Sequence, residues 1–251
     1  LMKASDEELQ ATVMDRAFRW ALSFQCKEGG FAAFDKDVTK PWLEKVPFSD
    51  HNAILDPPCS DITGRMLEYI GKADYPIDSK TLKSILAYIK KTQEPDGSWY
   101  GRWGVNYIYG TWQALRGLDA LKIDMNQDWI IRSRNWLESC QNPDGGWGET
   151  PGSYDFPSLK GLGISTATQT AWAVMGILSF GDPTRASIKS GIKFLTDTQY
   201  ADGTWNGDQY TGTGFPKVYY MRYDYYRINW PLIALAEYQN SLKKWALRST
   251  P

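Results

Sequence analysis

Apolar residues recur along most of the chain at the three-to-four-residue spacing of amphipathic α-helices, and two kinds of helix alternate. Helices with one apolar and one charged face are predicted at residues 5–25, 80–93, 127–141 and 185–199. Helices that are apolar almost all round are predicted at residues 61–71, 107–121, 165–181 and 226–238. A helix that is apolar all round must be covered on all sides, so the alternation predicts an outer and an inner layer.

This arrangement predicts an all-α protein of the α/α barrel, or toroid, class, with about four helix pairs in one domain over residues 1–251. Strand signals are few. In the first helix, Leu9, Val13, Ala17, Trp20 and Phe24 keep helical spacing along one face.

A motif recurs where the amphipathic helices end: a glutamine closes the helical run, and an aromatic ring follows six residues later. Glycine adopts the left-handed conformation that ends a helix, and aspartate favours the same turn. The glutamine can then bond backbone groups at a neighbouring helix end while the ring packs over it. We assign this structural role to four pairs: Gln25 with Phe31, Gln93 with Trp99, Gln141 with Trp147 and Gln199 with Trp205.

Aromatic content is high, with 12 Trp and 15 Tyr, and such side chains are common where ligands are held. Glycine- and aromatic-rich connections gather at one end of a barrel, where a pocket can open. Near the end of the chain, four rings recur every three or four residues, which would place them on one helical face as a core stripe or as the wall of a cavity. They are Phe215, Tyr219, Tyr223 and Tyr226.

Charge and reactive residues exclude several classes of protein. A formal net charge of −1 gives no basic surface for nucleic acid. Three scattered cysteines predict neither a disulfide framework nor a zinc site, and fit a reducing, intracellular setting. His51 is the only histidine, so a histidine-rich metal site is excluded. No apolar run approaches the roughly 20 residues of a spanning helix.

Acidic side chains offer few clear sites. Asp61 begins an inner helix, where it can cap the helix or serve a catalytic group, and both interpretations stay open. The "DKD" segment at 35–37 has no further metal-ligand spacing beside it.

The glutamine–tryptophan repeats resemble the QW motifs of triterpene cyclases. "GGFAAFDKD", "DPPCSDITGRMLE", "QEPDGSWYGRWGVNYIYGT", "QNPDGGWGE" and "YTGTGFPKVYY" resemble the second half of bacterial squalene–hopene cyclases, over about residues 10–240. The resemblance implies an α/α barrel in a monotopic enzyme on the cytoplasmic side of the inner membrane. It also implies protonation of squalene or a related polyprene and ring closure through carbocations, with no metal and no cofactor.

The resemblance implies residue roles by position. Asp61, Arg65 and Tyr109 would form the network that supports the catalytic acid, with Arg65 standing where the best-studied bacterial enzyme has histidine. Phe34 replaces a cavity tyrosine and Tyr219 replaces a phenylalanine. The implied substrate-binding residues are Phe34, Trp103, Phe215, Tyr219, Tyr223 and Tyr226, and the implied channel residues are Phe48 and Ser49.

The Asp-x-Asp-Asp motif that supplies the proton in this family does not occur in the sequence. We therefore expect an incomplete barrel: the carboxy-terminal part of a cyclase, inactive alone, whose partners are the amino-terminal half, a polyprene and a membrane surface. A homodimer stays open. The alternatives are a non-catalytic toroid that binds an isoprenoid or sugar, a toroid glycosidase with paired carboxylates, and a zinc prenyltransferase subunit, whose ligands cannot be assembled from these residues.

Overall fold

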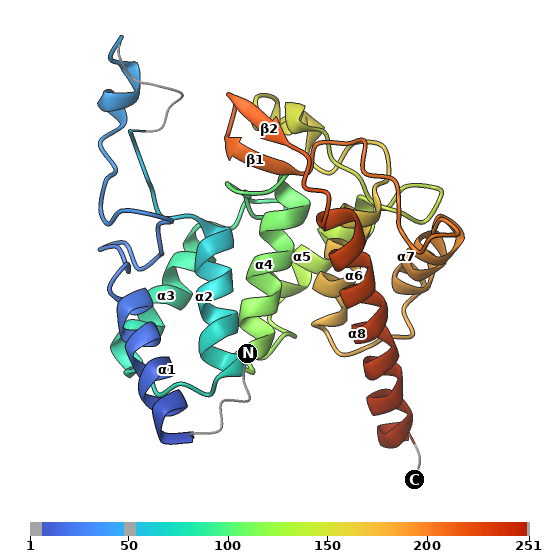
Figure 1. The fold of residues 1–251 in the computed structure, drawn as a ribbon, viewed down its shortest axis with the longest axis horizontal. Coiled ribbons are helices and arrows are strands. Elements are labelled where there is room, and N and C mark those ends of the chain that lie inside the picture. Colours follow the sequence, from blue (N-terminus) through green and yellow to red (C-terminus); the bar gives the residue numbers. More distant parts are fainter. Residues whose placement is uncertain (1–6, 48–53, 250–251) are drawn as a thin grey trace.

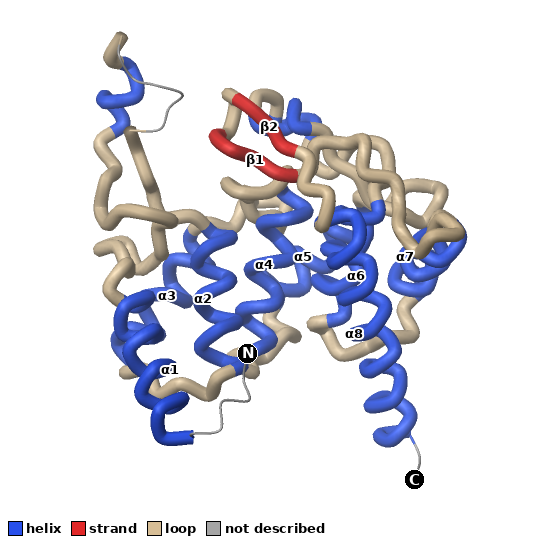
Figure 2. The backbone as a smooth tube through the Cα atoms, in the orientation of Figure 1, coloured by secondary structure: helices blue, strands red, loops and turns tan. Residues whose placement is uncertain are grey.

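The computed structural model describes residues 7–47 and 54–249. These residues form α-helices, three short 3-10 helices and one β-hairpin (Figures 1 and 2). The α-helices are α1 (Glu7–Leu22), α2 (Ser60–Lys72), α3 (Ser79–Lys91), α4 (Tyr107–Ala120), α5 (Asp128–Ser139), α6 (Ala167–Leu178), α7 (Ala186–Asp197) and α8 (Tyr226–Ser249). The other elements are η1 (Pro41–Lys45), η2 (Pro151–Tyr154), η3 (Pro157–Leu159), β1 (Gly212–Phe215) and β2 (Tyr219–Met221).

The helices lie in two layers. Helices α2, α4, α6 and α8 pack in a row, while α3 packs on α2, α5 on α4 and α6, and α7 on α6 (Figure 1). The hairpin lies beyond the helix ends, above α4 in the view of Figure 1. The predicted alternation of outer and inner helices in a mainly helical chain is therefore confirmed. None of the α-helices in the described residues is long and apolar enough to cross a membrane.

Only the two middle helices of the inner row are buried all round. All residues of α6 and nearly all of α4 are buried. Helices α2 and α8 stand at the ends of the row and expose one face, with Arg65 on α2 and Leu232 on α8 open to solvent. The expectation of four apolar inner helices is thus wrong for α2 and α8. Helix α8 also extends to Ser249, beyond its predicted end at residue 238.

Helix α1 does not pack on the core through the apolar face that its sequence predicts. Phe18, outside that stripe, is the buried residue, and its ring stacks between Tyr69 and Tyr75 at centroid distances of 3.9 and 4.0 Å. Val13 and Trp20 are 53% and 67% exposed. Helical spacing predicted the element correctly, whereas the neighbouring aromatic side chains decide which face is buried.

The prediction that four late aromatic residues share a helical face is wrong. Phe215 lies in β1 and Tyr219 in β2, Tyr223 follows the hairpin, and Tyr226 begins α8. The residue before a proline is pushed out of the helical region, and Pro216 follows Phe215. Lys217 then takes a positive φ of 70° in the turn.

The repeated tryptophans fasten each outer helix to the loop that follows it. Each buried indole donates its N–H to a carbonyl ten residues earlier, near the end of the outer helix that precedes the tryptophan. The bonds run from Trp99 to Ile89 (2.8 Å), from Trp147 to Leu137 (2.7 Å) and from Trp205 to Leu195 (2.7 Å). We call each of these bonds a clasp.

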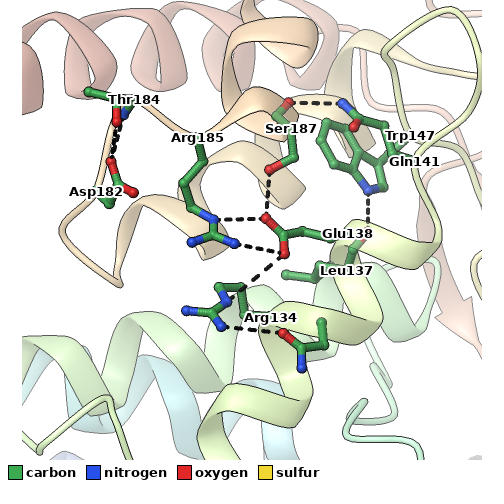
Figure 3. Close-up of polar contacts among 10 residues, drawn as sticks. Arg134, Leu137, Glu138, Gln141, Trp147, Asp182, Thr184, Arg185 and Ser187 are labelled. Carbon is green, nitrogen blue, oxygen red and sulfur yellow. Dashed lines mark hydrogen bonds and ion pairs between the residues drawn. The ribbon is translucent and has the colours of Figure 1, made fainter.

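Two of the repeated glutamines also reach the next outer helix. Gln93 Nε2 lies 2.7 Å from the Trp129 carbonyl and 2.9 Å from Ser133 Oγ, both on α5. Gln141 Nε2 donates to the Ser187 carbonyl of α7 at 2.9 Å (Figure 3). Gln199 bonds the carbonyl of Gly203 in its own turn, at 3.0 Å.

Gln25 of the first repeat likewise bonds its own turn, donating to the Gly29 carbonyl at 3.1 Å. Its partner Phe31 is buried. Having no N–H to donate, the Phe31 ring cannot form the clasp and packs by apolar contact, while the Phe31 backbone N–H donates to Thr63 Oγ1 at 2.9 Å.

Helix α4 begins under a cap supplied by a distant residue. Its flanking residue Asn106 makes no side-chain cap, and the carboxylate of Glu149 accepts the backbone N–H of Asn106 at 3.3 Å and of Ile108 at 2.9 Å. Glu149 is 4% exposed, and burial raises its pKa despite these bonds.

We expect Gln93→Ala to destabilise the chain more than Gln199→Ala. Removing the half-buried amide of Gln93 takes away the hydrogen bonds that the Trp129 carbonyl and Ser133 Oγ of α5 accept from it, costing about 1–3 kcal/mol. Water replaces the exposed amide of Gln199 at less than about 1 kcal/mol. Urea unfolding followed by circular dichroism measures both. Equal losses of unfolding free energy in the two variants would show that the contact of Gln93 with the next outer helix does not stabilise the chain.

We expect Glu149→Gln to stabilise the chain at neutral pH. The pKa of Glu149 is raised in the folded state, so its contribution to the free energy of unfolding is full below its ordinary pKa of about 4.3. That contribution is lost as pH rises through the folded-state pKa. Glutamine stays neutral and avoids this loss. The stability of Glu149→Gln relative to the unchanged chain therefore increases as pH rises over this range, to roughly 1 kcal/mol, or about 2–4 °C in melting temperature. Exposed Glu28, changed to glutamine, is the control. A pH-independent difference would contradict this account.

Candidate functional site

Asp61 connects the start of α2 to the loop that precedes α4. It is fully buried in the first helical turn, and its Oδ2 accepts the backbone N–H of Trp103 at 2.8 Å. The flanking residue of the helix is Cys59, so the interpretation of Asp61 as a cap is wrong. Its other oxygen, Oδ1, is buried and has no hydrogen-bond partner among the described residues.

Arg65 lies one turn further along α2 and bonds Tyr109 of α4. An Arg65 Nη donates to the Tyr109 hydroxyl at 2.7 Å, and the guanidinium carbon lies 5.7 Å from the ring centre. Gln113, with its amide oriented to satisfy both groups, accepts from Arg65 at 3.1 and 3.2 Å. These bonds hold the cation against α4.

Tyr109 remains protonated in this setting. It is buried, and burial raises its pKa although Arg65 acts in the opposite direction. Because its oxygen accepts from Arg65, its own proton is available for a further acceptor. Asp61, Arg65 and Tyr109 therefore present an acceptor, a cation and a donor at neighbouring positions on the first two inner helices.

A row of aromatic rings continues from this group. Phe34 meets Trp103 at 5.5 Å, Trp103 meets Phe215 at 6.3 Å, and Phe215 meets Tyr219 at 5.9 Å between centroids, all edge-on. Phe34 and Tyr219 are 72% and 44% exposed, so the row borders an open face. We call these four rings the ring wall. Their π faces can attract positive charge.

A second aromatic cluster lies deeper in the inner row. Tyr226 meets Tyr223 at 4.6 Å, Trp230 at 5.9 Å and Trp172 at 6.0 Å. Trp172 in turn meets Tyr109 at 4.9 Å. The structure thus brings Tyr223 and Tyr226 near Tyr109, but through tryptophans that the sequence analysis did not single out.

These tryptophans had a signal in the sequence. Trp112 and Trp172 are the sixth residues of α4 and α6, Trp230 is the fifth of α8, and Arg65 is the sixth of α2. Aligning the inner helices by their starts would have grouped them. Trp112 and Trp172 stack at 5.7 Å, and the indole N–H groups of all three tryptophans lack a partner among the described residues.

The loop that carries Phe34 is fixed by an acidic side chain. The carboxylate of Asp56 accepts the backbone N–H groups of Ala33, Phe34 and Asp35. Asp37 accepts the backbone N–H of Lys27 at 2.9 Å. These acids organise the loop backbone, and no group of three or more His, Cys, Asp or Glu able to hold a metal occurs among the described residues.

Other expected features lie elsewhere. Phe48, Ser49 and His51 fall outside the described residues. A cavity of about 470 Å³ opens between the start of α6, the end of α7 and the start of α8. Of the residues expected to support the acid or bind substrate only Tyr223 lines it, together with Gln199 of the last repeat. The predicted site is a surface rather than this cavity.

The chain is similar in sequence to proteins of one family. The profile of the squalene–hopene cyclase C-terminal domain matches residues 1–240. A squalene–hopene cyclase of Zymomonas mobilis is 42% identical over 231 residues, covering 91% of this chain and 35% of that protein. A dammaradiene synthase of Dryopteris crassirhizoma is 40% identical, covering 96% of this chain and 39% of that protein. This chain therefore spans between 35% and 39% of the length of these relatives.

A solved structure shares the fold. A type II terpene cyclase from Scytonema, in complex with merosterolic acid A, superposes with a TM-score of 0.64 at 16% identity, over 90% of this chain and 66% of that one. The resemblance noted from the repeats is thereby confirmed at the level of family and fold: the chain belongs to the squalene–hopene cyclase C-terminal domain family.

Proposed function

We propose that this chain forms the carboxy-terminal part of an enzyme that cyclises squalene, or a related linear polyprene, to a pentacyclic hopanoid. One observation carries the proposal beyond family membership. The bond from Trp103 to Asp61 joins the ring wall to the group formed by Asp61, Arg65 and Tyr109. Groups suited to supporting an acid and groups suited to holding a cation therefore meet at one place.

The reaction begins with a proton that this chain does not supply. An Asp-x-Asp-Asp acid, contributed by the amino-terminal portion of the enzyme, protonates the terminal double bond. Arg65 and Tyr109 orient that acid, and the free Oδ1 of Asp61 accepts a hydrogen bond from the network around it. We propose these three side chains as its support.

Ring closure then moves positive charge along the polyprene. Each alkene donates its π electrons to the neighbouring cation, forming one carbon–carbon bond and a new cation further along. Loss of a proton ends the cascade, so substrate and product are isomers and no cofactor is consumed. The ring wall, Tyr223 and Tyr226 stabilise the cations by about 0.5–2 kcal/mol per ring.

The surroundings of the site follow from the same proposal. Carbocations react with water, so the open face beside Phe34 must be closed, and we assign that closure to the amino-terminal half. We propose that the complete enzyme binds the cytoplasmic side of the inner membrane without spanning it, because its substrate is a lipid. Phe48 and Ser49 are proposed to line the substrate channel.

We expect the 251-residue chain to form no cyclised product from squalene when incubated alone, because its sequence lacks the acid motif. Gas chromatography with mass spectrometry measures the products. Hopene formed by the purified chain would overturn the assignment of the proton donor to another part of the enzyme.

A chimaera tests the function itself. We expect this chain to support cyclisation when it replaces the matching region of the Zymomonas mobilis relative. Asp61→Asn should then lower the rate by about 100-fold or more, because it weakens support of the acid. Asp128→Asn is the matched control, since Asp128 lies in the first turn of α5 but is exposed.

The outcomes separate the claims. A folded chimaera that binds squalene without forming product would favour the non-catalytic binding module. Full activity of Asp61→Asn would remove Asp61 from the acid-supporting network and leave the cyclase proposal standing.

A further inference from the structure

A single buried hydroxyl joins the two segments that carry the middle of the ring wall. Tyr154, the last residue of η2, is 4% exposed. Its oxygen lies 2.6 Å from the Gly101 carbonyl, 2.8 Å from the Gly104 carbonyl and 2.9 Å from Thr213 Oγ1. The Tyr154 proton is shared by the two carbonyls, and the Thr213 hydroxyl can donate to the Tyr154 oxygen.

The three partners lie close to two rings of the wall. Gly101 and Gly104 flank Trp103, and Thr213 precedes Phe215 by two residues on β1. Backbone pairing supports this junction, because the Val105 N–H donates to the Thr211 carbonyl at 3.0 Å. That pairing aligns the chains beyond Trp103, whereas the Tyr154 hydroxyl holds both ends of the loop that presents the ring.

The Tyr154 ring is itself held on two sides. Tyr100 meets it edge-on at 5.4 Å, and Tyr220 of β2 stacks on it at 5.7 Å. Tyr220 is the neighbour of Tyr219, the next ring of the wall. One side chain outside the wall therefore contacts the loop, β1 and β2 together.

We propose that Tyr154 is a positioning residue that sets the separation of Trp103 and Phe215, which is 6.3 Å between ring centres. This inference rests on the proposed function, in which those rings hold a cation. Attraction between a cation and a ring requires the cation to lie within about 6 Å of the ring centre, so two rings share one cation only if their spacing is kept. Loss of the Tyr154 hydroxyl frees the loop from β1 while leaving Trp103 and Phe215 in the sequence.

The test uses the 251-residue chain and two matched probes. One is farnesyltrimethylammonium, and the other is its neutral isostere with a tert-butyl group in place of the trimethylammonium group. Isothermal titration calorimetry gives the ratio of the two affinities. We expect the unchanged chain to prefer the cation by about fivefold or more, and Tyr154→Phe to reduce this preference to less than about twofold.

Tyr88→Phe is the control for losing a buried tyrosine hydroxyl. Tyr88 is also buried, and its hydroxyl donates to the Pro58 carbonyl at 2.7 Å, away from the ring wall. We expect this variant to keep the preference of the unchanged chain. A general loosening of the fold would lower both affinities in either variant, whereas loss of ring spacing changes their ratio in Tyr154→Phe alone.

The outcomes distinguish this inference from the proposed function. If the unchanged chain shows no preference for the cation, the proposed role of the rings fails and this inference fails with it. If the preference is present and survives in Tyr154→Phe, only the role of Tyr154 is overturned. Should Tyr154→Phe fail to fold, Thr213→Val removes a partner of the same hydroxyl, and a preserved preference in that variant would likewise overturn the inference.

Discussion

The hydrogen bond from a repeated tryptophan to the end of its own outer helix is the constraint on which the rest of the structure depends. At Trp99, Trp147 and Trp205 the indole N–H donates to a carbonyl in the last turn of the outer helix that precedes it. The loop that follows each ring therefore leaves its helix in the same way. Because Gln93 and Gln141 extend two of these junctions to the next outer helix, the outer layer is joined pair by pair.

The candidate site uses the loops that these clasps orient. The loop after Trp99 carries Trp103, whose backbone is held by Asp61 from α2. The loop after Trp147 carries Glu149, which caps α4, and leads to Tyr154, which holds β1. The inner helices supply the rigid groups, and the loops, bonded to one another by buried polar atoms, place the rings between them.

The sequence predicted some parts of the fold and of the candidate site but not others. The positions of the helices could be predicted, because helical spacing is local, whereas Asp61, Arg65 and Tyr109 were grouped only through the resemblance to squalene–hopene cyclases. The hairpin was missed, since a ring at every third or fourth position fits a helix until Pro216 and the turn at Lys217 are considered. Tyr154 could not be predicted, because its partners lie 50 to 59 residues away in the chain.

The sequence by itself determined the helices, their order in two alternating layers, the repeated helix ends and the family. These features depend on the local spacing of apolar residues and on motifs that recur along the chain. Only the tertiary structure decided which face of α1 is buried, that Asp61 bonds the Trp103 backbone rather than capping α2, and that the late rings divide between a hairpin and a helix. Those outcomes depend on contacts between segments distant in the chain, where burial and the need to pair buried polar groups select one arrangement.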